Sequence, residues 1–380
     1  MPVFGTRPEA IKLAPVIRTL GASPDFEVLP VVTGQHREML DQVLEVFQIR
    51  PVADLNIMER EQSLTHVTCA ALSGLERVLA RLRPDAVLVQ GDTTTTFAAA
   101  LAAFYQRIPV GHVEAGLRSG RLDNPYPEEL NRRLTAVVSH WHFAPTARAR
   151  QSLVAEGVPE ERVWVTGNTV IDALQEVASR CRFEPRGELA ALWERGLRWL
   201  LVTAHRRESW GEPHRRVFRA LRELVRRFAD VGVVVSVHPN PAVRRVAQEE
   251  LAGTPRCVLM EPPDYVEFVG LLQACYLVLT DSGGIQEEAP ALGRPVLVLR
   301  EVTERPEGVE AGCARLVGTD TERIVEEASR LLQDPQAYQA MARARNPYGD
   351  GLAARRIEQV LRQHFGLAVR EPVHPPTFGG

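Results

Sequence analysis

Short apolar runs alternate along this chain with segments in which apolar residues recur at helical spacing. Within the runs, valine, isoleucine and leucine follow one another with little polar alternation, which is typical of strands buried on both faces of a parallel sheet. The alternation therefore predicts an α/β fold. The first series of predicted strands comprises residues 28–34, 86–92, 109–115, 140–146 and 163–168, and the second series comprises residues 199–205, 232–239, 257–261, 276–284 and 295–301.

The two series are separated by TGNTVIDAL (166–174) and by a charged region that extends to residue 198. Because 380 residues exceed one ordinary core, two domains are expected. We predict two Rossmann-like, doubly wound domains, residues 1–168 and 169–351, with a hinge around Asn168 and a cleft between them. The tail, residues 367–380, is rich in proline and glycine and is expected to be frayed.

The composition excludes several classes of protein. A hydrophobic content of 45% and a charged content of 24% are those of a soluble globular chain. The net charge of −3 provides no general attraction to nucleic acid. No apolar run approaches the roughly 20 residues that a membrane-spanning helix needs, and the first residues lack the pattern of a signal peptide. We therefore expect a cytoplasmic protein with neither a nucleic-acid nor a membrane partner.

The cysteines and the glycine motifs exclude further classes. The cysteines are scattered and odd in number, which fits reduced core thiols better than a disulfide framework. With no CxxC pair and no HExxH motif, no metal site is predicted. A GxGxxG fingerprint and a Gly-Lys-Ser/Thr phosphate loop are also missing. The cysteines are Cys69, Cys181, Cys257, Cys275 and Cys313.

Residues 214–228, HRRVFRALRELVRRF, form the one strongly basic segment. Its arginines recur at helical spacing, and Phe218, Leu221, Val225 and Phe228 form an apolar stripe. A solvated amphipathic helix explains this pattern fully, and a polyanion-binding face is the less favoured interpretation.

All but one of the 45 basic residues are arginine; the exception is Lys12, in FGTRPEAIKLAP (4–15). Phe4 ends a predicted strand, and Thr6 and Glu9 form a capping box at the start of a helix. The free amides of a helix N-terminus favour an anion, and a neighbouring lysine adds positive charge. The alternative is that Lys12 pairs with Glu9 on an exposed face, a contact of a few tenths of a kcal/mol. The segment alone leaves both interpretations open.

Carboxylates follow two strands of the first domain and open one of its helices. Asp92 comes after AVLVQG, and it is either a helix cap or an acid–base group. Glu114 comes after PVGHV, where a carboxylate without a partner is unfavourable in the core and a cleft position is favoured. Glu128 and Arg132 lie four residues apart on a helix opened by Pro127, a spacing that is also common for a simple ion pair.

The second domain offers a phosphate site at strand ends. In YLVLTDSGGIQEEAP, Ser282, Gly283 and Gly284 let backbone amides approach a diphosphate at a helix N-terminus, and Glu288 is placed one turn later for ribose hydroxyls. Two histidines, His205 and His238, also end successive strands. A lone histidine is more often structural, but two at one sheet edge favour a site. Carboxylates in one domain and a phosphate site in the other suggest a sugar nucleotide as the substrate.

Many separate motifs, in order and over nearly the whole chain, resemble the non-hydrolysing bacterial UDP-N-acetylglucosamine 2-epimerases. The motifs are FGTRPEAIK, TGQHREMLDQVL, GDTTTT, IPVGHVEAGLRSG, PEELNRRLT, TGNTVIDAL, HRRES, TDSGGIQEEAP, TERPEGVEAG and NPYGDG. The resemblance implies the two-domain architecture of GT-B glycosyltransferases, with a C-terminal helix, residues 352–366, packed back on the first domain. It also implies a cofactor-free homodimer.

The resemblance further implies reversible conversion of UDP-N-acetylglucosamine to UDP-N-acetylmannosamine by elimination and re-addition of UDP, for surface polysaccharide precursors. The alternatives are a relative that hydrolyses UDP from the same substrate, a GT-B glycosyltransferase, or a nucleotide-sugar-binding regulator without turnover. The implied catalytic residues are Asp92, Glu114 and Glu128, supported by Arg132 and His205. The implied substrate contacts are Arg7, Lys12, Phe268, Ser282, Gly283, Gly284, Glu288 and Arg305. Which carboxylate acts as the base stays open.

One branch of the family binds a second substrate molecule as an activator, at positions matching Gln35 and His238. This chain has Glu38 where that branch has glutamine, and Pro263 where some relatives place a glutamine near the uracil. Allosteric activation is therefore an open expectation here.

Overall fold

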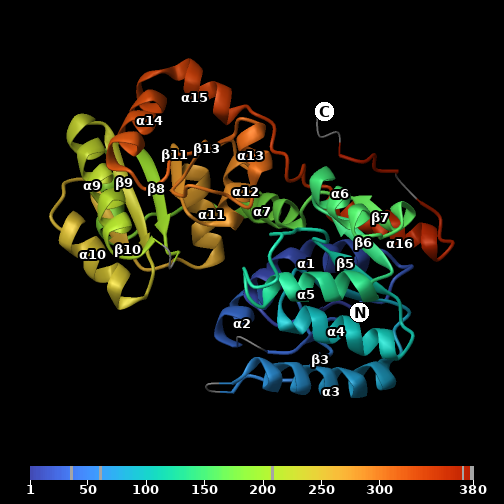
Figure 1. The fold of residues 1–380 in the computed structure, drawn as a ribbon. Helices are drawn as coiled ribbons and strands as arrows, with labels where there is room; N and C mark the ends of the chain where they lie inside the picture. Colours follow the sequence, from blue (N-terminus) through green and yellow to red (C-terminus); the bar gives the residue numbers. More distant parts are fainter. Residues whose placement is uncertain (35–36, 60–61, 207–208, 370–371, 377–380) are drawn as a thin grey trace. The chain divides into compact units, whose positions relative to one another are not determined.

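The computed structural model describes residues 1–34, 37–59, 62–206, 209–369 and 372–376. The chain divides into two compact units (Figure 1): unit 1 comprises residues 1–173 and 348–380, and unit 2 comprises residues 174–347. The boundaries expected at 168 and 351 therefore shift. They shift because the backbone N–H of Asn168 donates to the Tyr348 carbonyl (2.7 Å), and Asp172 accepts from the Ala354 N–H (2.8 Å), which holds both segments in unit 1.

Unit 1 is built on parallel strands. One sheet has the order β1-β2-β3 and the other β4-β5-β6-β7, and a parallel bridge between Pro2 and Leu88 joins them at β1 and β4. The strands are β1 (Val3–Phe4), β2 (Val31–Val32), β3 (Ala53–Asp54), β4 (Val87–Gln90), β5 (Val110–Val113), β6 (Trp141–Ala144) and β7 (Val163–Val165). The helices are α1 (Arg7–Gly21), α2 (Arg37–Val46), α3 (Leu64–Leu82), α4 (Thr94–Tyr105), α5 (Glu128–Val138), α6 (Ala147–Ala155), the 3-10 turn η1 (Glu160–Arg162), α7 (Thr169–Arg180), which continues into unit 2, and α16 (Ala353–His364).

Unit 2 contains one parallel sheet of six strands in the order β10-β9-β8-β11-β12-β13. Its strands are β8 (Arg198–Ala204), β9 (Val231–Val237), β10 (Cys257–Met260), β11 (Leu277–Thr280), β12 (Val296–Val298) and β13 (Ala314–Leu316). Its helices are α8 (Gly187–Trp193), α9 (Glu212–Arg227), α10 (Pro241–Leu251), α11 (Tyr265–Ala274), α12 (Gly283–Ala291), α13 (Pro306–Glu310), α14 (Thr321–Gln333) and α15 (Pro335–Ala342).

The strand order reverses once in each unit, between β1 and β4 and between β8 and β11. In doubly wound sheets such a reversal opens a crevice at the carboxyl ends of the strands, where ligands bind. The α/β, doubly wound prediction is confirmed. Two short strands, β3 and β13, were not predicted, because each is only two or three residues long and lies at a sheet edge.

Residues 214–227 of the basic segment lie within α9, as the amphipathic pattern predicts, and Phe228 follows the last helical residue. Phe218, Leu221 and Val225 are buried against the unit 2 sheet. On the outer face, Arg215 pairs with Glu249, and other arginines of the helix pair with Glu212, Glu223 and Glu250. These ion pairs favour the solvated-face interpretation over a polyanion site.

The predicted C-terminal helix is α16, which belongs to unit 1 and packs on α1. Arg362 of α16 contacts Asp25 (2.9 Å), just beyond α1. Within the tail that is expected to be frayed, the Val373 N–H donates to Gln359 and the His374 carbonyl accepts from Arg356, both on α16. Residues 370–371 and 377–380 lie outside the described residues.

The five cysteines are unpaired, but they are not all in the core. Cys257, Cys275 and Cys313 are buried, Cys181 is half-buried, and Cys69 on α3 is exposed, which corrects the expectation of core thiols. Within the described part of the chain, no helix is both long and apolar enough to cross a bilayer.

Candidate functional site

In unit 1, the predicted site residues gather at the carboxyl ends of β1, β4 and β5. The turn after β1 leads into α1 and Lys12, the turn after β4 contains Asp92, and Glu114 directly follows β5. These turns flank the reversal of strand order, where the fold places a ligand.

Glu114 is enclosed by hydrogen-bond donors. Its side chain is 5% exposed, and both carboxylate oxygens lie 2.6 Å from the Lys12 ammonium. Asn168 donates its amide to Oε1 (3.0 Å), and the Gln90 amide donates to Oε2. Lys12 therefore pairs with Glu114 across the site and not with Glu9, so the exposed i, i+3 interpretation is wrong. A buried carboxylate with this many donors is held in one orientation.

The backbone after β5 is bent to make this contact. Glu114 has a φ of +65°, a left-handed conformation that is uncommon for residues other than glycine. Gly116 follows with a φ of +91°, and a Cβ there would lie 2.2 Å from the Ala149 carbonyl oxygen. Strained backbone of this kind is found most often at functional sites.

Asp92 forms the second pair. Its Oδ2 accepts from Arg132 Nε (2.9 Å) and also lies 2.7 Å from a second guanidinium nitrogen, so two nitrogens of one arginine contact the same oxygen. Arg132 is also 3.1 Å from Glu129, and Asn131 donates to the Asp92 carbonyl (2.9 Å). The cap of α4 is Thr93, whose hydroxyl accepts from the Thr96 N–H, so Asp92 is not the helix cap.

Glu128 differs from the other two carboxylates. It opens α5, and its Oε2 is buried with no hydrogen-bond partner among the described residues. Arg132, four residues later, turns to Asp92 instead, so the simple ion pair between Glu128 and Arg132 is not what orients this helix. A buried carboxylate oxygen without a donor is unfavourable unless it serves a function, which makes Glu128 a candidate for contact with a substrate.

A buried histidine contacts the backbone of the turn that contains Asp92. His112 on β5 is fully buried, and its Nε2 lies 2.7 Å from the Gly91 carbonyl oxygen. Burial lowers the pKa of His112 to about 4, so the ring is neutral at neutral pH and donates Nε2–H to that carbonyl. Gly91 has a φ of +73°, which the turn requires.

In unit 2, the site residues gather at the ends of β8 and β11. Asp281 follows β11, is 1% exposed, and accepts hydrogen bonds from the backbone N–H groups of His205 and Arg206 (2.8 Å each). Its second oxygen lies 2.9 Å from Nδ1 of His205, at ion-pair distance but poorly aligned for a hydrogen bond. Burial raises the pKa of Asp281, but the His205 ring and the two amides outweigh burial, so the pKa lies below its ordinary value.

Helix α12 begins beside two guanidinium groups. Its cap, Ser282, makes no side-chain hydrogen bond to the helix. A Cβ built at Gly283 would meet Arg305 and Arg206 at 3.9–4.0 Å, so both guanidiniums lie at this N-terminus. Arg305 pairs with the buried Glu287, whereas the buried Arg206 Nε has no hydrogen-bond partner in the described part of the chain. The Ser282 N–H donates to the Thr280 hydroxyl (3.0 Å), which corrects the expectation that its amide is available, so the amides that suit an anion here are those of Gly283 and Gly284, beside the two guanidiniums.

The remaining predicted residues of unit 2 lie around these groups. Glu288 is half-buried on α12, close enough to Tyr265 that burial and the Glu288 charge together raise the pKa of Tyr265 well above its ordinary value. Phe268 is half-buried on α11. The His238 ring stacks on His205 with 6.1 Å between ring centres, which confirms that the two strand-end histidines lie together.

Two further residues of unit 1 were predicted as contacts, Arg7 and Gln35. Arg7 is half-buried in the first turn of α1. Gln35 lies outside the described residues.

Sequence reasoning missed five polar groups of these sites: Gln90, His112, Asn168, Arg206 and Asp281. Each lies at or next to a strand end, or in a motif already quoted, so position in the fold could have selected them. Their side-chain type alone could not, because amides and buried histidines most often serve as structural partners. The described residues contain no cluster of three or more His, Cys, Asp or Glu suited to a metal ion.

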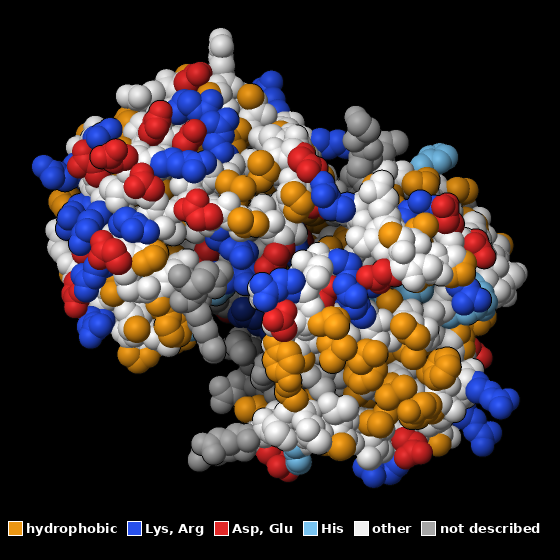
Figure 2. All heavy atoms as spheres, in the orientation of Figure 1, with side chains coloured by type: hydrophobic (Ala, Val, Ile, Leu, Met, Phe, Trp, Pro, Cys, Tyr) orange, Lys and Arg blue, Asp and Glu red, His pale blue; other side chains and the backbone are white. Residues whose placement is uncertain are grey.

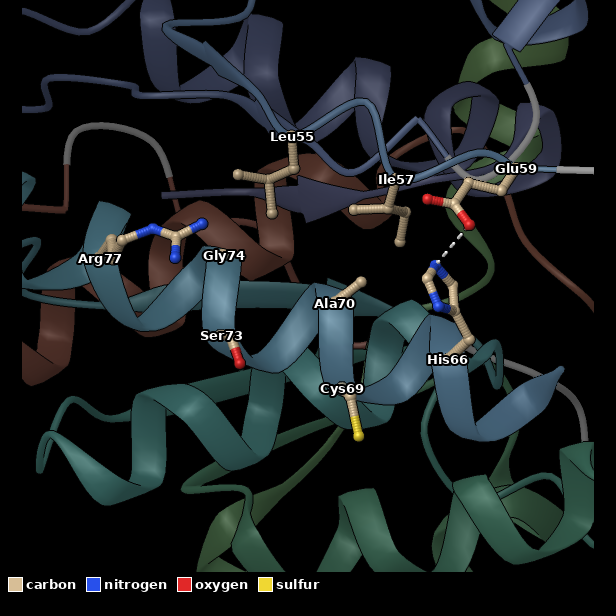
Figure 3. Close-up of a pocket in the computed structure, with 9 residues that line it drawn as sticks. All are labelled: Leu55, Ile57, Glu59, His66, Cys69, Ala70, Ser73, Gly74 and Arg77. Carbon is tan, nitrogen blue, oxygen red and sulfur yellow. Dashed lines mark ion pairs between the residues drawn. The ribbon is translucent and has the colours of Figure 1, made fainter. Parts of the chain in front are cut away.

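Figure 3 shows a groove of about 480 Å³ elsewhere in unit 1, between α3 and the segment that follows β3. Leu55 and Ile57 point toward α3, and an ion pair between His66 and Glu59 (3.3 Å) lies at one end. None of the predicted site residues lines this groove, so it is separate from the carboxylate site.

Two Rossmann-like units, one with paired carboxylates and one with an anion site at a helix N-terminus, define an enzyme that acts on nucleotide sugars. Residues 18–362 match the family model "UDP-N-acetylglucosamine 2-epimerase". The chain belongs to this family.

The curated UDP-N-acetylglucosamine 2-epimerase of Escherichia coli K12 is 53% identical over 367 residues, covering 95% of this chain and 98% of that protein. The crystal structure of the UDP-GlcNAc 2-epimerase of Neisseria meningitidis bound to UDP-GlcNAc is similar at 47% identity with a TM-score of 0.85, covering 95% and 99% of the two chains. A glycosyltransferase of kitacinnamycin, at 15% identity and a TM-score of 0.65 over 95% and 98%, shares the fold alone. The expected family and the GT-B-like architecture are confirmed.

Proposed function

We propose that this protein interconverts UDP-N-acetylglucosamine and UDP-N-acetylmannosamine without hydrolysing either. The observation that carries the proposal is a set of three carboxylates in unit 1: Asp92 and Glu114 follow neighbouring strands, and Glu128 opens α5, the helix whose Arg132 contacts Asp92. Inverting carbon 2 requires removal of a carbon-bound proton that no carbonyl acidifies. Elimination of UDP across carbons 1 and 2 leaves a glycal, and re-addition of UDP and a proton from the opposite face gives the epimer. Such a route needs one group to accept the proton and another to return one.

We assign the proton-accepting role to Glu128. Its buried Oε2 has no hydrogen-bond partner among the described residues. Glu114 and Asp92 are instead held by Lys12 and Arg132. Those two carboxylates orient the sugar, and one of them returns the proton to carbon 2 after it has taken up a proton from water, once the substrate rearranges its ion pair; the proton accepted by Glu128 is released to water. Lys12 forms an ion pair with Glu114, and its ammonium would stabilise the negative charge that develops on the leaving UDP during elimination.

Unit 2 would bind the UDP part. The first amides of α12, at Gly283 and Gly284, and the Ser282 hydroxyl would receive the diphosphate, and Arg206 and Arg305 add positive charge beside them; the Ser282 N–H already donates to the Thr280 hydroxyl (3.0 Å). A leaving diphosphate is stabilised by donors of this kind. Glu288 and Phe268, further along α12 and on α11, would contact the ribose and the base, and His205, oriented by Asp281, would contact the diphosphate.

One experiment separates the possible activities. The protein is incubated with UDP-N-acetylglucosamine in deuterated water without an acceptor and followed by NMR. Deuterium at carbon 2 of intact UDP-N-acetylmannosamine is expected. Free sugar with UDP would identify a hydrolase, dependence on an added acceptor a transferase, and no change a binding protein. In Glu128→Gln, exchange at carbon 2 should stop while UDP still binds; continued exchange would remove Glu128 from the base role.

We also propose a homodimer formed through unit 1. Apolar side chains gather over the face that carries α3, α4 and α5 (Figure 2). On α5, Leu130, Leu134 and Val137 are exposed at spacings that place them on one side of the helix, and Val137 is 81% exposed. Beside them, Phe104 and Tyr105 end α4. A contiguous exposed apolar surface of this kind is typical of a protein interface.

The dimer is tested by light scattering coupled to gel filtration. Val137→Glu places a charge in the apolar surface and should convert a dimer of the 42.2 kDa chain to a monomer. Val302→Glu, an exposed apolar residue of unit 2, is the matched control and should leave the mass unchanged. A wild-type mass of one chain would contradict the proposal.

On the basis of the resemblance we also propose a cytoplasmic location for this protein and the use of its product for surface polysaccharide precursors. Cell fractionation and the loss of N-acetylmannosamine from surface polysaccharide in a deletion strain would test them. Activation by a second substrate molecule through Gln35 and His238 stays a prediction, for which a sigmoidal rate curve is the test.

A further inference from the structure

Glu9 is a buried carboxyl group for which the proposed reaction has no use. It lies in the first turn of α1 and is 1% exposed. Its Oε2 accepts from the backbone N–H groups of Gly5 (3.0 Å) and Thr6 (2.8 Å), and from the Thr6 hydroxyl (2.7 Å). The capping box predicts the Thr6 contact, but not the complete burial.

The other oxygen of Glu9 reaches a different segment. Oε1 lies 2.7 Å from the Thr93 hydroxyl and 3.0 Å from the Thr96 hydroxyl, both at the start of α4. One carboxyl group therefore links the turn after β1 to the turn after β4. The first turn leads to Lys12, one helical turn beyond Glu9, and the second contains Asp92, next to Thr93.

The hydrogen count at this link indicates a neutral carboxyl group. The Thr96 hydroxyl lies 2.7 Å from the Gln90 carbonyl oxygen, which has no hydrogen to donate. The single Thr96 hydrogen cannot serve both that carbonyl and Glu9. A proton on Glu9 Oε1 satisfies the second contact, because it donates to Thr96. In agreement, burial raises the pKa of Glu9, although the hydrogen bonds oppose the shift.

We propose that Glu9 is a positioning residue whose neutral carboxyl group holds the Lys12 helix and the Asp92 turn at a fixed spacing. Displacing one turn relative to the other would move the Lys12 ammonium away from Glu114 and the Asp92 carboxylate away from Arg132. Only interactions that are correctly placed at the transition state increase turnover, so the effect appears in kcat more than in nucleotide binding. This inference rests on the proposed epimerase function.

The test compares Glu9→Ala with Glu9→Gln. The glutamine amide can accept from Gly5 and Thr6 and donate toward Thr96, so kcat should stay within about threefold of wild type. Alanine removes the link, and kcat should fall about 10- to 100-fold while the Kd for UDP is unchanged. Thr95→Val is the matched control, since it removes a buried hydroxyl from the same turn of α4 that contacts Thr33 (2.9 Å) and not Glu9.

Hydrogen–deuterium exchange provides a readout that does not depend on activity. In Glu9→Ala, residues 5–12 and 90–97 should lose protection together, and in Glu9→Gln and Thr95→Val they should not. Unchanged kcat and protection in Glu9→Ala, or a loss no greater than that of Thr95→Val, would overturn the positioning role. A Glu9→Gln variant as impaired as Glu9→Ala would overturn the neutral link. If the wild type shows no epimerisation, the proposed function fails, and the exchange comparison still decides whether Glu9 joins the two turns.

Discussion

The two site regions use charge in opposite ways. In unit 1, two carboxylates are already neutralised: Glu114 lies 2.6 Å from Lys12, and Asp92 lies 2.7 Å from Arg132. In unit 2, the first amides of α12 receive no hydrogen bond from the cap side chain, and the buried Arg206 Nε has no hydrogen-bond partner among the described residues. The charged groups of the unit 1 site thus pair with one another, whereas those of unit 2 include a guanidinium group that can still bind an anion.

This difference separates catalysis from affinity. A charge pair that must rearrange when substrate binds contributes little to ground-state binding but sets the orientation of reacting groups. Open amides and guanidiniums contribute to affinity directly, because they exchange water for phosphate oxygens. Substitutions in unit 1 should therefore change kcat, and substitutions in unit 2 should change Kd.

The largest effect is expected from neutralising the paired carboxylates of unit 1. Asp92→Asn and Glu114→Gln should each lower kcat by about 1000-fold or more, because a group that moves a proton or orients the sugar is lost. The Kd for UDP, measured by calorimetry, should stay within about threefold. Glu156→Gln, which breaks a pair with Arg118 elsewhere in unit 1, is the control and should retain wild-type turnover. Wild-type rates in either site variant would refute its role.

A smaller loss is expected when the ammonium of Lys12 becomes a guanidinium. Both Glu114 oxygens lie 2.6 Å from one compact nitrogen, and the side chain of Lys12 is 17% exposed, so a planar fork does not fit the same space. Lys12→Arg should fold normally by thermal melting and lower kcat by about 10- to 100-fold. Arg150→Lys, the reverse exchange at an exposed pair with Glu160, should leave kcat unchanged. Full activity of Lys12→Arg would show that the charge alone is needed.

The complementary effect is expected in unit 2. Arg206→Gln removes one of the two charges beside the start of α12 and should weaken UDP binding about 10- to 30-fold, or about 1.4–2 kcal/mol. The value of kcat at saturating substrate should change by less than about threefold. Arg215→Gln on α9, whose partner is Glu249, serves as the control. If Arg206→Gln instead lowered kcat and left Kd intact, the separation between the two regions would fail.

The last effect is on stability and changes neither turnover nor binding; it concerns α7, through which the chain passes from one region to the other. Burial raises the pKa of Asp172 to about 6, although the amides of Ala353 and Ala354 donate to it. The folded state thus binds this proton more tightly than the unfolded chain, whose pKa is near 3.8. The stabilisation of the folded state by protonated Asp172 is complete below the unfolded pKa of 3.8 and is lost as the pH rises to the folded pKa of about 6.

Asp172→Asn removes this titration. The free energy of unfolding of the wild type, relative to the variant, should therefore fall by on the order of 2–3 kcal/mol between about pH 4 and about pH 6. Urea unfolding at a series of pH values measures the difference. A difference that stays constant with pH would contradict the prediction.

The fold was largely predictable because its signals are local. Parallel strands buried on both faces appear as continuous apolar runs, and α9 carries its apolar stripe and its arginines at helical spacing. The strands β3 and β13 were not predictable, because two or three edge residues are too few for a pattern. The boundary between the two units falls within α7. Its position depends on the hydrogen bond that Asn168 donates to Tyr348 and on the one that Asp172 accepts from Ala354, and no local pattern encodes contacts so far apart in the sequence.

The candidate residues of the site were predictable, but their pairings were not. Strand-end position selects Asp92 and Glu114, yet local spacing suggested Glu9 as the partner of Lys12, and Glu128 as that of Arg132. Both long side chains turn instead to carboxylates on other elements. The choice depends on the left-handed backbone at Glu114 and on the burial of Glu9 by threonine hydroxyls, and both arise only once the sheet has formed.

The single lysine of this chain is also a unique site for chemical labelling. Lys12 carries the only ε-amine in 380 residues, and that amine is engaged by Glu114 in a partly buried position. Acylation by an amine-directed reagent, measured on the peptide that contains Lys12 and not on the α-amine of Met1, would therefore report on one ion pair: labelling is slow while the pair is closed and accelerates when it opens. The molecule could be followed through its working cycle by mass spectrometry, without introducing a probe residue.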